Sequence, residues 1–186
     1  MDLTLLKAIN YALPYMGEAQ VTSTDARNPT VALILSAIED HQMALLAEGM
    51  WFNTAKRYLY PDSEKQIFVP ANTLSIYSLE NRILENRNGK LYDMDNGTFN
   101  FDAKVHVDIK EWLDFEDLPI YARYVLMVQA AIQVYVQDYG PENTIQVLYK
   151  ELTKYQNLLR QEHLRKQDFN TMRSNRGARF IKHLRR

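Results

Sequence analysis

The stretch Gly49-Met50-Trp51-Phe52-Asn53 decides the fold of this chain, because the pattern of apolar residues changes on either side of it. Helical spacing precedes it, the short alternating pattern of β-strands follows for about sixty residues, and helical spacing returns from Leu118. Gly49 can end a helix in the left-handed conformation. Trp51 and Phe52 each bring roughly 150–250 Å² of apolar surface to this junction. We predict that Gly49, Trp51 and Phe52 form a buried hinge between helix and strand.

This change of pattern predicts an α+β fold, in which the N- and C-terminal segments build a helical domain around a β-rich insertion at about 50–115. We expect a helical part at 1–49 and a β-rich insertion at 50–117. A helical hairpin at 118–164 should complete the helical domain, and a basic docking tail should follow at 165–186.

The composition is that of an ordinary globular protein, with 46% hydrophobic and 24% charged residues among 186. The absence of cysteine excludes disulfides, thiolate metal sites and cysteine nucleophiles. The longest strongly apolar run, residues 31–38, is far shorter than the roughly 20 residues that cross a bilayer. No secretory signal pattern opens the chain, and we expect a soluble protein that does not contact membranes.

The helical segments begin and end at recognisable signals. Residues 2–15 have helical spacing, with Asp2 placed to favour the helix N-terminus. Asn28-Pro29 is a strong start for a second helix that runs to Gly49. The acidic stretch 114–117 and Pro119 open the third, and Gly140-Pro141 separates it from a fourth with Ile145, Leu148, Leu152, Tyr155 and Leu159 on one face.

The middle of the chain reads as short strands at 56–60, 66–69, 73–79 and 105–110. Asn88-Gly89 and Asn96-Gly97 each supply two residues that tolerate positive φ, as a two-residue hairpin turn requires. These turns predict a meander of three strands.

Three groups of residues could in principle carry chemistry, and each has a simpler explanation. The four histidines (His41, His106, His163 and His183) have no metal-ligand spacing. The sequence Asp93-Met94-Asp95-Asn96-Gly97 imitates a calcium loop, but its twelfth position is Lys104 where a glutamate is needed. The acids Glu111, Asp114, Glu116 and Asp117 are better explained by the start of a helix. We expect no enzyme and no metal or cofactor site.

Charge is distributed unevenly along the chain. Residues 165–186 hold eight Lys/Arg and one acid, which leaves 14 basic and 22 acidic residues in 1–164, a net charge of −8. The tail also contains Phe180, Ile181 and Leu184, which a purely electrostatic nucleic-acid arm does not need. We therefore favour docking on a protein over nucleic-acid contact or plain disorder. The predicted interface residues of this docking tail are Arg173, Arg176, Arg179, Phe180, Lys182, Arg185 and Arg186.

Tyrosine is abundant, with twelve copies. Tyr121, Tyr124, Tyr135 and Tyr139 could be core residues, but tyrosine is also enriched at protein interfaces. The sequence leaves both readings open.

Several stretches together resemble the tail tubular protein A family of short-tailed phages. They are Ala8-Ile9-Asn10-Tyr11-Ala12-Leu13-Pro14-Tyr15-Met16-Gly17-Glu18 with Val21, Asn28-Pro29-Thr30, residues 49–53, Gly89-Lys90-Leu91-Tyr92-Asp93, and residues 115–119 followed by Tyr124, Ala130 and Gly140. No single motif is strong, but the ordered set, spanning about residues 5–160 with the helix–β–helix layout, is fairly specific.

The resemblance implies a structural protein of the virion tail, made in the host cytoplasm. Members of this family form a dodecameric ring between the portal and the tail nozzle, retain the packaged DNA and pass it during ejection. We therefore expect three kinds of partner: sister copies in the ring, the portal protein, and a nozzle similar to tail tubular protein B. DNA would pass through without specific binding, since an acidic channel wall repels phosphates.

Two other hypotheses remain at this point. The basic tail alone would suit a nucleic-acid-binding module, whose binding would depend steeply on salt. Glu111 and Asp114 would be the candidate acids of a polysaccharide hydrolase, which needs two carboxylates at a defined separation.

Overall fold

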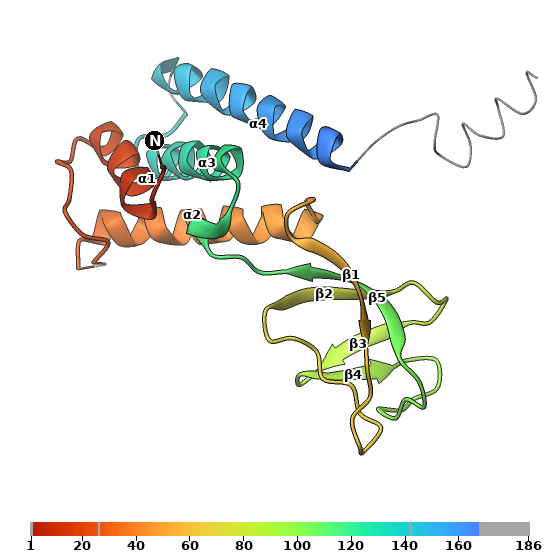
Figure 1. Ribbon diagram of the computed structural model, residues 1–186. Coiled ribbons are helices and arrows are strands. Elements are labelled where there is room, and N and C mark those ends of the chain that lie inside the picture. Colours follow the sequence, from red (N-terminus) through yellow and green to blue (C-terminus); the bar gives the residue numbers. More distant parts are fainter. Residues whose placement is uncertain (1, 26, 142, 168–186) are drawn as a thin grey trace, which may run out of the picture.

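The computed structural model describes residues 2–25, 27–141 and 143–167. It confirms the α+β class: helices from both terminal segments lie together, and the strands between them form a separate part that extends from the end of α2 (Figure 1). The helices are α1 (Leu5–Ala12), α2 (Pro29–Glu48), α3 (Ile120–Tyr139) and α4 (Gln146–Lys166). Three short 3₁₀ helices are η1 (Leu13–Met16), η2 (Phe115–Asp117) and η3 (Asn143–Ile145).

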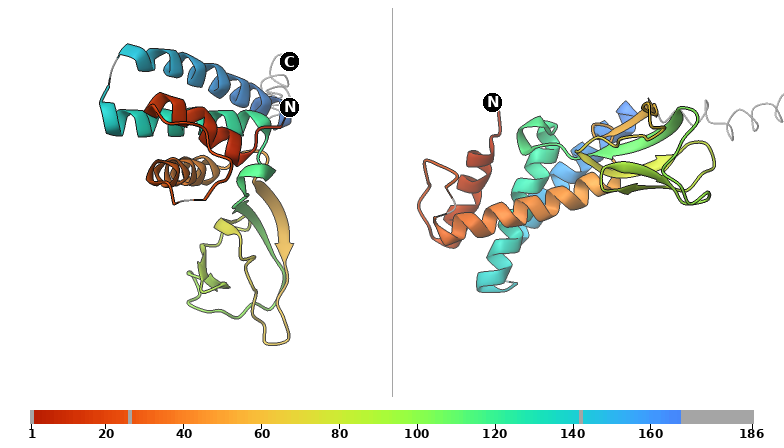
Figure 2. Two further views of the ribbon diagram at one scale, coloured as in Figure 1. Left: turned by 90° about the vertical axis from the view of Figure 1, so that its left-hand side faces the viewer. Right: turned by 90° about the horizontal axis from the view of Figure 1, so that it is seen from below.

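Helix α3 is the centre of the helical part, because it packs against α1, α2 and α4. Its buried residues lie all around it, as expected for a helix with neighbours on several sides. They are Ala122, Val125, Leu126, Met127, Val128, Ala130, Ala131, Ile132 and Val134. The predicted helical hairpin is present as α3 and α4, and the views in Figure 2 agree that these two helices lie side by side.

Helix α2 begins and ends at the predicted signals. The Asn28 side chain accepts hydrogen bonds from the amides of Thr30 (2.8 Å) and Val31 (3.4 Å), and Gly49 ends the helix with φ of 82°. By length and composition α2 could cross a membrane, with a mean hydropathy of 1.2. It packs against α3 and α1 instead, and core helices of globular proteins often pass that test.

The N-terminal helix is shorter than predicted. The Thr4 side chain caps α1, so the helix begins at Leu5 rather than Asp2, and η1 carries the chain from Leu13 past Pro14. The Asp2 carboxylate does not serve the helix start. It pairs at 2.8 Å with Arg123 of α3, an interaction between distant segments that local spacing cannot reveal.

The strands form two small antiparallel sheets. The three-stranded sheet has the order β1 (Thr54–Leu59), β5 (Val105–Glu111), β2 (Thr73–Ser78), and β3 (Leu84–Arg87) pairs with β4 (Lys90–Asp93). Val105, Val107 and Ile109 alternate on the buried face of β5, as predicted. They join a second apolar cluster, separate from the helical core, with Ile67, Val69, Ile76, Leu84, Leu91 and Phe101.

The predicted meander is only half right. Asn88 and Gly89 adopt φ of 54° and 79° and close the β3–β4 hairpin, as expected. At Asn96-Gly97, in contrast, the chain turns back through a single bridge between Asp93 and Thr98. The predicted strand at 66–69 also makes only isolated bridges, to Asn100 and Lys90, so it is an extended segment over the cluster and not a strand.

Two helix boundaries differ from the prediction by a few residues. The acidic stretch forms η2, and α3 begins only at Ile120, because Pro119 and Leu118 are extended. At the other end α4 continues to Lys166, so the first two residues assigned to the tail belong to the helix.

Candidate interaction surfaces

The hinge at residues 49–53 lies against the last turns of α4. The Trp51 and Phe52 rings meet edge to face at 4.9 Å, and both side chains are half-buried against the helical core. The Trp51 ring is 5.8 Å from that of His163, whose Nδ1 accepts a hydrogen bond of 3.3 Å from the Trp51 amide. The hinge therefore touches the helix from which the predicted docking tail departs.

Asn53, which the sequence did not single out, ties the hinge together. Its side chain is buried, accepts a hydrogen bond from the Met50 amide (2.8 Å), and donates to the carbonyls of Leu46 (2.8 Å) and Glu111 (3.0 Å). One residue thus joins the end of α2, the turn and the last residue of β5. An asparagine directly after two large apolar residues is the only local signal that could have indicated this role.

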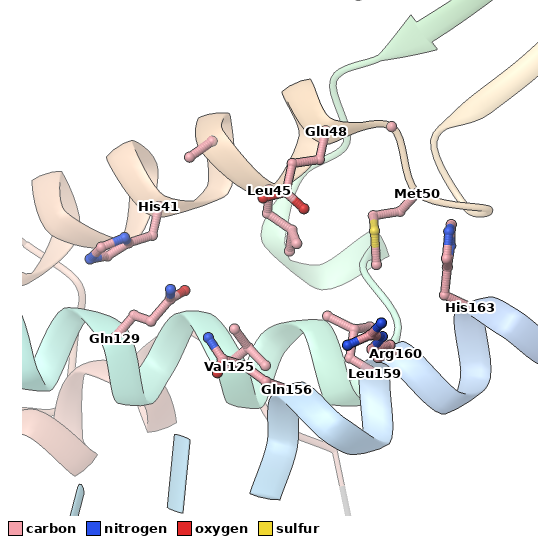
Figure 3. A pocket seen from close by; sticks show the side chains of 12 residues that line it. His41, Leu45, Glu48, Met50, Val125, Gln129, Gln156, Leu159, Arg160 and His163 are labelled. Atoms are coloured by element: carbon pink, nitrogen blue, oxygen red, sulfur yellow. The ribbon is translucent and has the colours of Figure 1, made fainter. Parts of the chain in front are cut away.

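A groove opens between α2, α3 and α4 directly beside the hinge (Figure 3). Its volume is about 420 Å³. Leu45, Val125 and Leu159 supply apolar surface, while Glu48, Gln129 and Arg160 supply polar groups. The other lining residues are His41, Ala44, Gly49, Met50, Gln156 and His163. This mixture suits contact with a partner side chain, and the lining includes two of the four histidines.

The surroundings of His41 in this groove shift the pKa of its imidazole. Burial lowers the pKa of His41 below its ordinary value, and only partly offsetting effects come from Asp40 and from a hydrogen bond with Gln133. The imidazole is therefore held in the neutral form, because burial penalises the charged form.

The acid cluster is used to hold the chain together. Glu111 forms an ion pair with Arg57 at 3.0 Å, and Glu116 Oε1 accepts from the Leu5 amide at 3.2 Å. Asp114 accepts from the indole N–H of Trp112 at 3.3 Å, and Asp117 is exposed. These contacts join β5 to β1 and η2 to the start of α1, which gives Glu111 and Glu116 a structural explanation.

The sequence that imitates a calcium loop forms a turn whose backbone is held by the Asp93 side chain. Asp93 accepts from the amides of Asp95 and Asn96, both at 3.0 Å, and from the Asn96 side chain at 2.8 Å. The Asn96 side-chain bond is the main reason that the pKa of Asp93 is lowered. Within residues 2–25, 27–141 and 143–167, no group of three or more His, Cys, Asp or Glu is placed to hold a metal ion.

The tyrosines divide between the two parts of the molecule. In the helical part they join helices: Tyr124 stacks on Tyr155 at 4.6 Å, and the Tyr11 hydroxyl donates to Glu151 at 2.7 Å. Burial, followed by that hydrogen bond, raises the pKa of Tyr11. In the β part, Tyr58, Tyr60 and Tyr77 are exposed. Of the four tyrosines that the sequence left open, Tyr121, Tyr124 and Tyr135 are half-buried in the helical part, whereas Tyr139 is exposed.

The predicted interface residues of the docking tail lie outside the described residues. These are Arg173, Arg176, Arg179, Phe180, Lys182, Arg185 and Arg186. The hinge and the groove lie where the described chain ends, since α4 reaches Lys166 and supplies Leu159, Arg160 and His163 to the groove.

Comparison with known proteins assigns this architecture to a family. The model of the tail tubular protein family, "Tube: Tail tubular protein", matches residues 6–169. The chain belongs to the tail tubular protein family. A relative named "Tail tubular protein A", from Klebsiella phage KP34, is 34% identical over 182 residues, which cover 97% of this chain and 96% of that protein.

As a tail tubular protein, the chain is a structural component of the virion tail. This result confirms the family resemblance inferred from the sequence. The residues that the family model matches begin in α1 and end just after α4. A structural role in the tail makes contact surfaces, rather than a catalytic centre, the features that matter most in this molecule.

Proposed function

We propose that this tail tubular protein is a head-to-tail adaptor that forms a ring between the portal and the tail nozzle. In this role it retains packaged DNA and then serves as the conduit for ejection. Family membership along nearly the whole chain carries the proposal. The exposed aromatic residues of the β part and the groove beside the hinge support it, because an assembly subunit needs several surfaces for several neighbours.

The helical part and the docking tail would face the portal, and the β part would meet the nozzle and neighbouring copies. A ring of twelve is the number that the resemblance to the tail tubular protein A family implies. The net charge of −8 in residues 1–164 suits a DNA passage, since carboxylates near the wall repel phosphates and keep the genome from adhering.

Electron microscopy of the purified chain mixed with the portal protein of the same virus tests this function. We expect a ring of copies seated on the portal, and a stable complex with the nozzle only when this chain is present. A portal–nozzle assembly that forms completely and without leakage in its absence would refute the adaptor role. The free chain should be measured in parallel, because the portal can template a ring that does not form alone.

Nucleic-acid binding through the tail is the alternative, and a gel shift separates the two. Function as a nucleic-acid-binding module requires that the chain bind duplex DNA, that this binding weaken steeply with salt, and that truncation after Leu164 abolish it. Ring formation on the portal without any gel shift at low salt would leave the adaptor as the function.

A further inference from the structure

The three-stranded sheet has one face buried on its own apolar cluster and one face open to solvent. The cross-strand register places Lys56, Asp108 and Tyr77 in one row of the open face, and Tyr58 beside His106 in the next. Tyr58 and Tyr77 are 47% and 56% exposed. We call these five residues the tyrosine face.

The tyrosine face is ordered before any partner arrives. The Tyr58 ring stacks on His106 with centroids 4.3 Å apart and planes 18° apart. The ammonium group of Lys104 lies 4.3 Å from the Tyr58 centroid, and that of Lys110 lies 5.6 Å from the Tyr77 centroid. Aromatic side chains that are already held in place lose little entropy on binding, which is why tyrosine anchors many interfaces.

Helix α2 has an outer stripe of exposed residues, which the rest of the described chain contacts at its last member through the bond from Lys110 to the Ala47 carbonyl. Five exposed residues recur at steps of three and four and therefore lie on one side of the helix. They are Leu33, Ser36, Asp40, Met43 and Ala47. Leu33 and Met43 are 47% and 48% exposed, whereas the opposite side buries Val31, Ile34 and Ile38 in the helical core.

The two surfaces are complementary in charge. Helix α2 carries Glu39, Asp40 and Glu48 and has no lysine or arginine in residues 29–48. Lys56, Lys104 and Lys110 lie at the tyrosine face, together with the acids Asp108 and, at its edge, Glu80, which accepts a hydrogen bond from the His106 amide. The same Asp108 disfavours a phosphate backbone on this face, so the complementarity favours an acidic protein surface over a nucleic acid.

The two surfaces belong to different parts of the molecule, α2 to the helical part and the three-stranded sheet to the β part (Figure 1). They approach each other where Lys110, beside Tyr77, contacts the carbonyl of Ala47. When two different patches of identical subunits pair head to tail, the growing oligomer keeps one free patch of each kind, one at each end. Such pairing closes into a ring when the rotation between neighbours permits it.

We propose that the tyrosine face of one copy binds the α2 stripe of the next copy, and that this contact builds the ring. The inference rests on the proposed adaptor function and names the surfaces that its ring uses. Lys56 and Lys104 of one copy lie near Glu39 and Asp40 of its neighbour, while Tyr58 and Tyr77 cover Leu33 and Met43.

Cysteine cross-linking tests the pairing directly, because the chain has no cysteine of its own. Ser36→Cys on the stripe and Ala103→Cys beside Lys104 are made in separate chains, because both positions are exposed and neither side chain takes part in the proposed contacts. Circular dichroism checks that both variants fold. The ring is assembled alone or on the portal, treated with a short bismaleimide, and resolved on a denaturing gel. We expect cross-linked dimers only when the two variants are mixed, and a ladder of oligomers when one chain carries both cysteines.

Dimers from either single variant alone would mean that like surfaces meet, and would overturn the pairing. A wild-type ring that forms while no combination cross-links would also overturn it, but would leave the adaptor function intact. Absence of any wild-type ring, even on the portal, would instead refute the proposed function and this inference together.

Charge reversal provides an independent measurement. Lys56→Glu with Lys104→Glu should weaken ring assembly at least about tenfold, because like charges then face each other. Adding Glu39→Lys and Asp40→Lys to the same chain should restore assembly, since every interface then has the opposite signs again. Reversal of both surfaces that leaves assembly as weak as reversal of one would contradict the pairing.

Discussion

The side chain of Lys110 lies directly against Gly49, so closely that a β-carbon on Gly49 would come within 2.6 Å of Lys110 Cε. From this position Lys110 Nζ donates a hydrogen bond of 2.6 Å to the Ala47 carbonyl at the end of α2. A cation from β5 thus satisfies an orphan carbonyl at the negative end of a helix. The glycine makes room for a contact that joins the helical part to the sheet.

Gly49→Ala should therefore destabilise the chain for two reasons. Alanine is strained at φ of 82°, which costs about 1 kcal/mol. Its methyl group must also displace Lys110 from the helix end, which removes a charge-assisted hydrogen bond worth roughly 1.5–3 kcal/mol where buried and less at this partly exposed site. Urea unfolding followed by circular dichroism measures the loss as a lower free energy of unfolding.

Gly17→Ala is the matched control for this substitution. Gly17 also has a positive φ, of 72°, but a β-carbon there would meet nothing within 4 Å. The free energy of unfolding of Gly17→Ala should therefore fall only by the cost of backbone strain. Equal losses in the two variants would mean that Lys110 moves aside at no cost and that its bond to Ala47 contributes little.

Asn53→Ala should be the more damaging change at the hinge. It leaves the Met50 amide and the carbonyls of Leu46 and Glu111 without their side-chain partner, and a buried group without a partner costs about 1–3 kcal/mol. Asn100→Ala, at an exposed site, should change the free energy of unfolding by no more than about 0.5 kcal/mol. A comparable small change for Asn53→Ala would show that water replaces all three bonds.

The sequence predicted the parts of the fold that depend on local chemistry. Helix α2 begins at the Asn28 cap and ends at Gly49, as capping rules require. Asn88-Gly89 closes a hairpin because both residues accept positive φ. The α3–α4 hairpin follows from apolar spacing alone. At these places backbone preference and tertiary packing favour the same structure.

The errors arose where a distant segment decides the local structure. Asp2 pairs with Arg123 instead of serving its own helix, and residues 66–69 lack a continuous partner strand. The same limit applies to the surfaces. Asn53 and Lys110 gain their roles from atoms of α2 and β5 that meet only in the fold, and the tyrosine face exists only once β1, β5 and β2 are in register.

The groove should make stability depend on pH through His41. Its folded pKa lies below the ordinary value, so the unfolded chain takes up the proton more readily, and the contribution to stability falls as pH drops through the range below about 6.5. His41→Gln removes this group. Urea unfolding at pH 7.5 and at pH 5.5 should therefore show a smaller loss in the variant than in the unaltered chain. An equal loss would assign the pH dependence to carboxylates elsewhere.

The docking tail should act through its positive charge in binding the portal. Arg176, Arg179 and Arg186 lie outside the described residues, and changing all three to Glu converts three cations to anions while every residue of the hinge and the groove keeps its identity. We expect this variant to lose portal binding in a pull-down at physiological salt, while its unfolding curve stays unchanged. Lys7→Glu with Lys150→Glu and Lys154→Glu, three exchanges at exposed helical positions, produces the same change of net charge and should retain binding. Undiminished capture of the triple variant would remove the tail from the docking mechanism and direct attention to the groove beside the hinge.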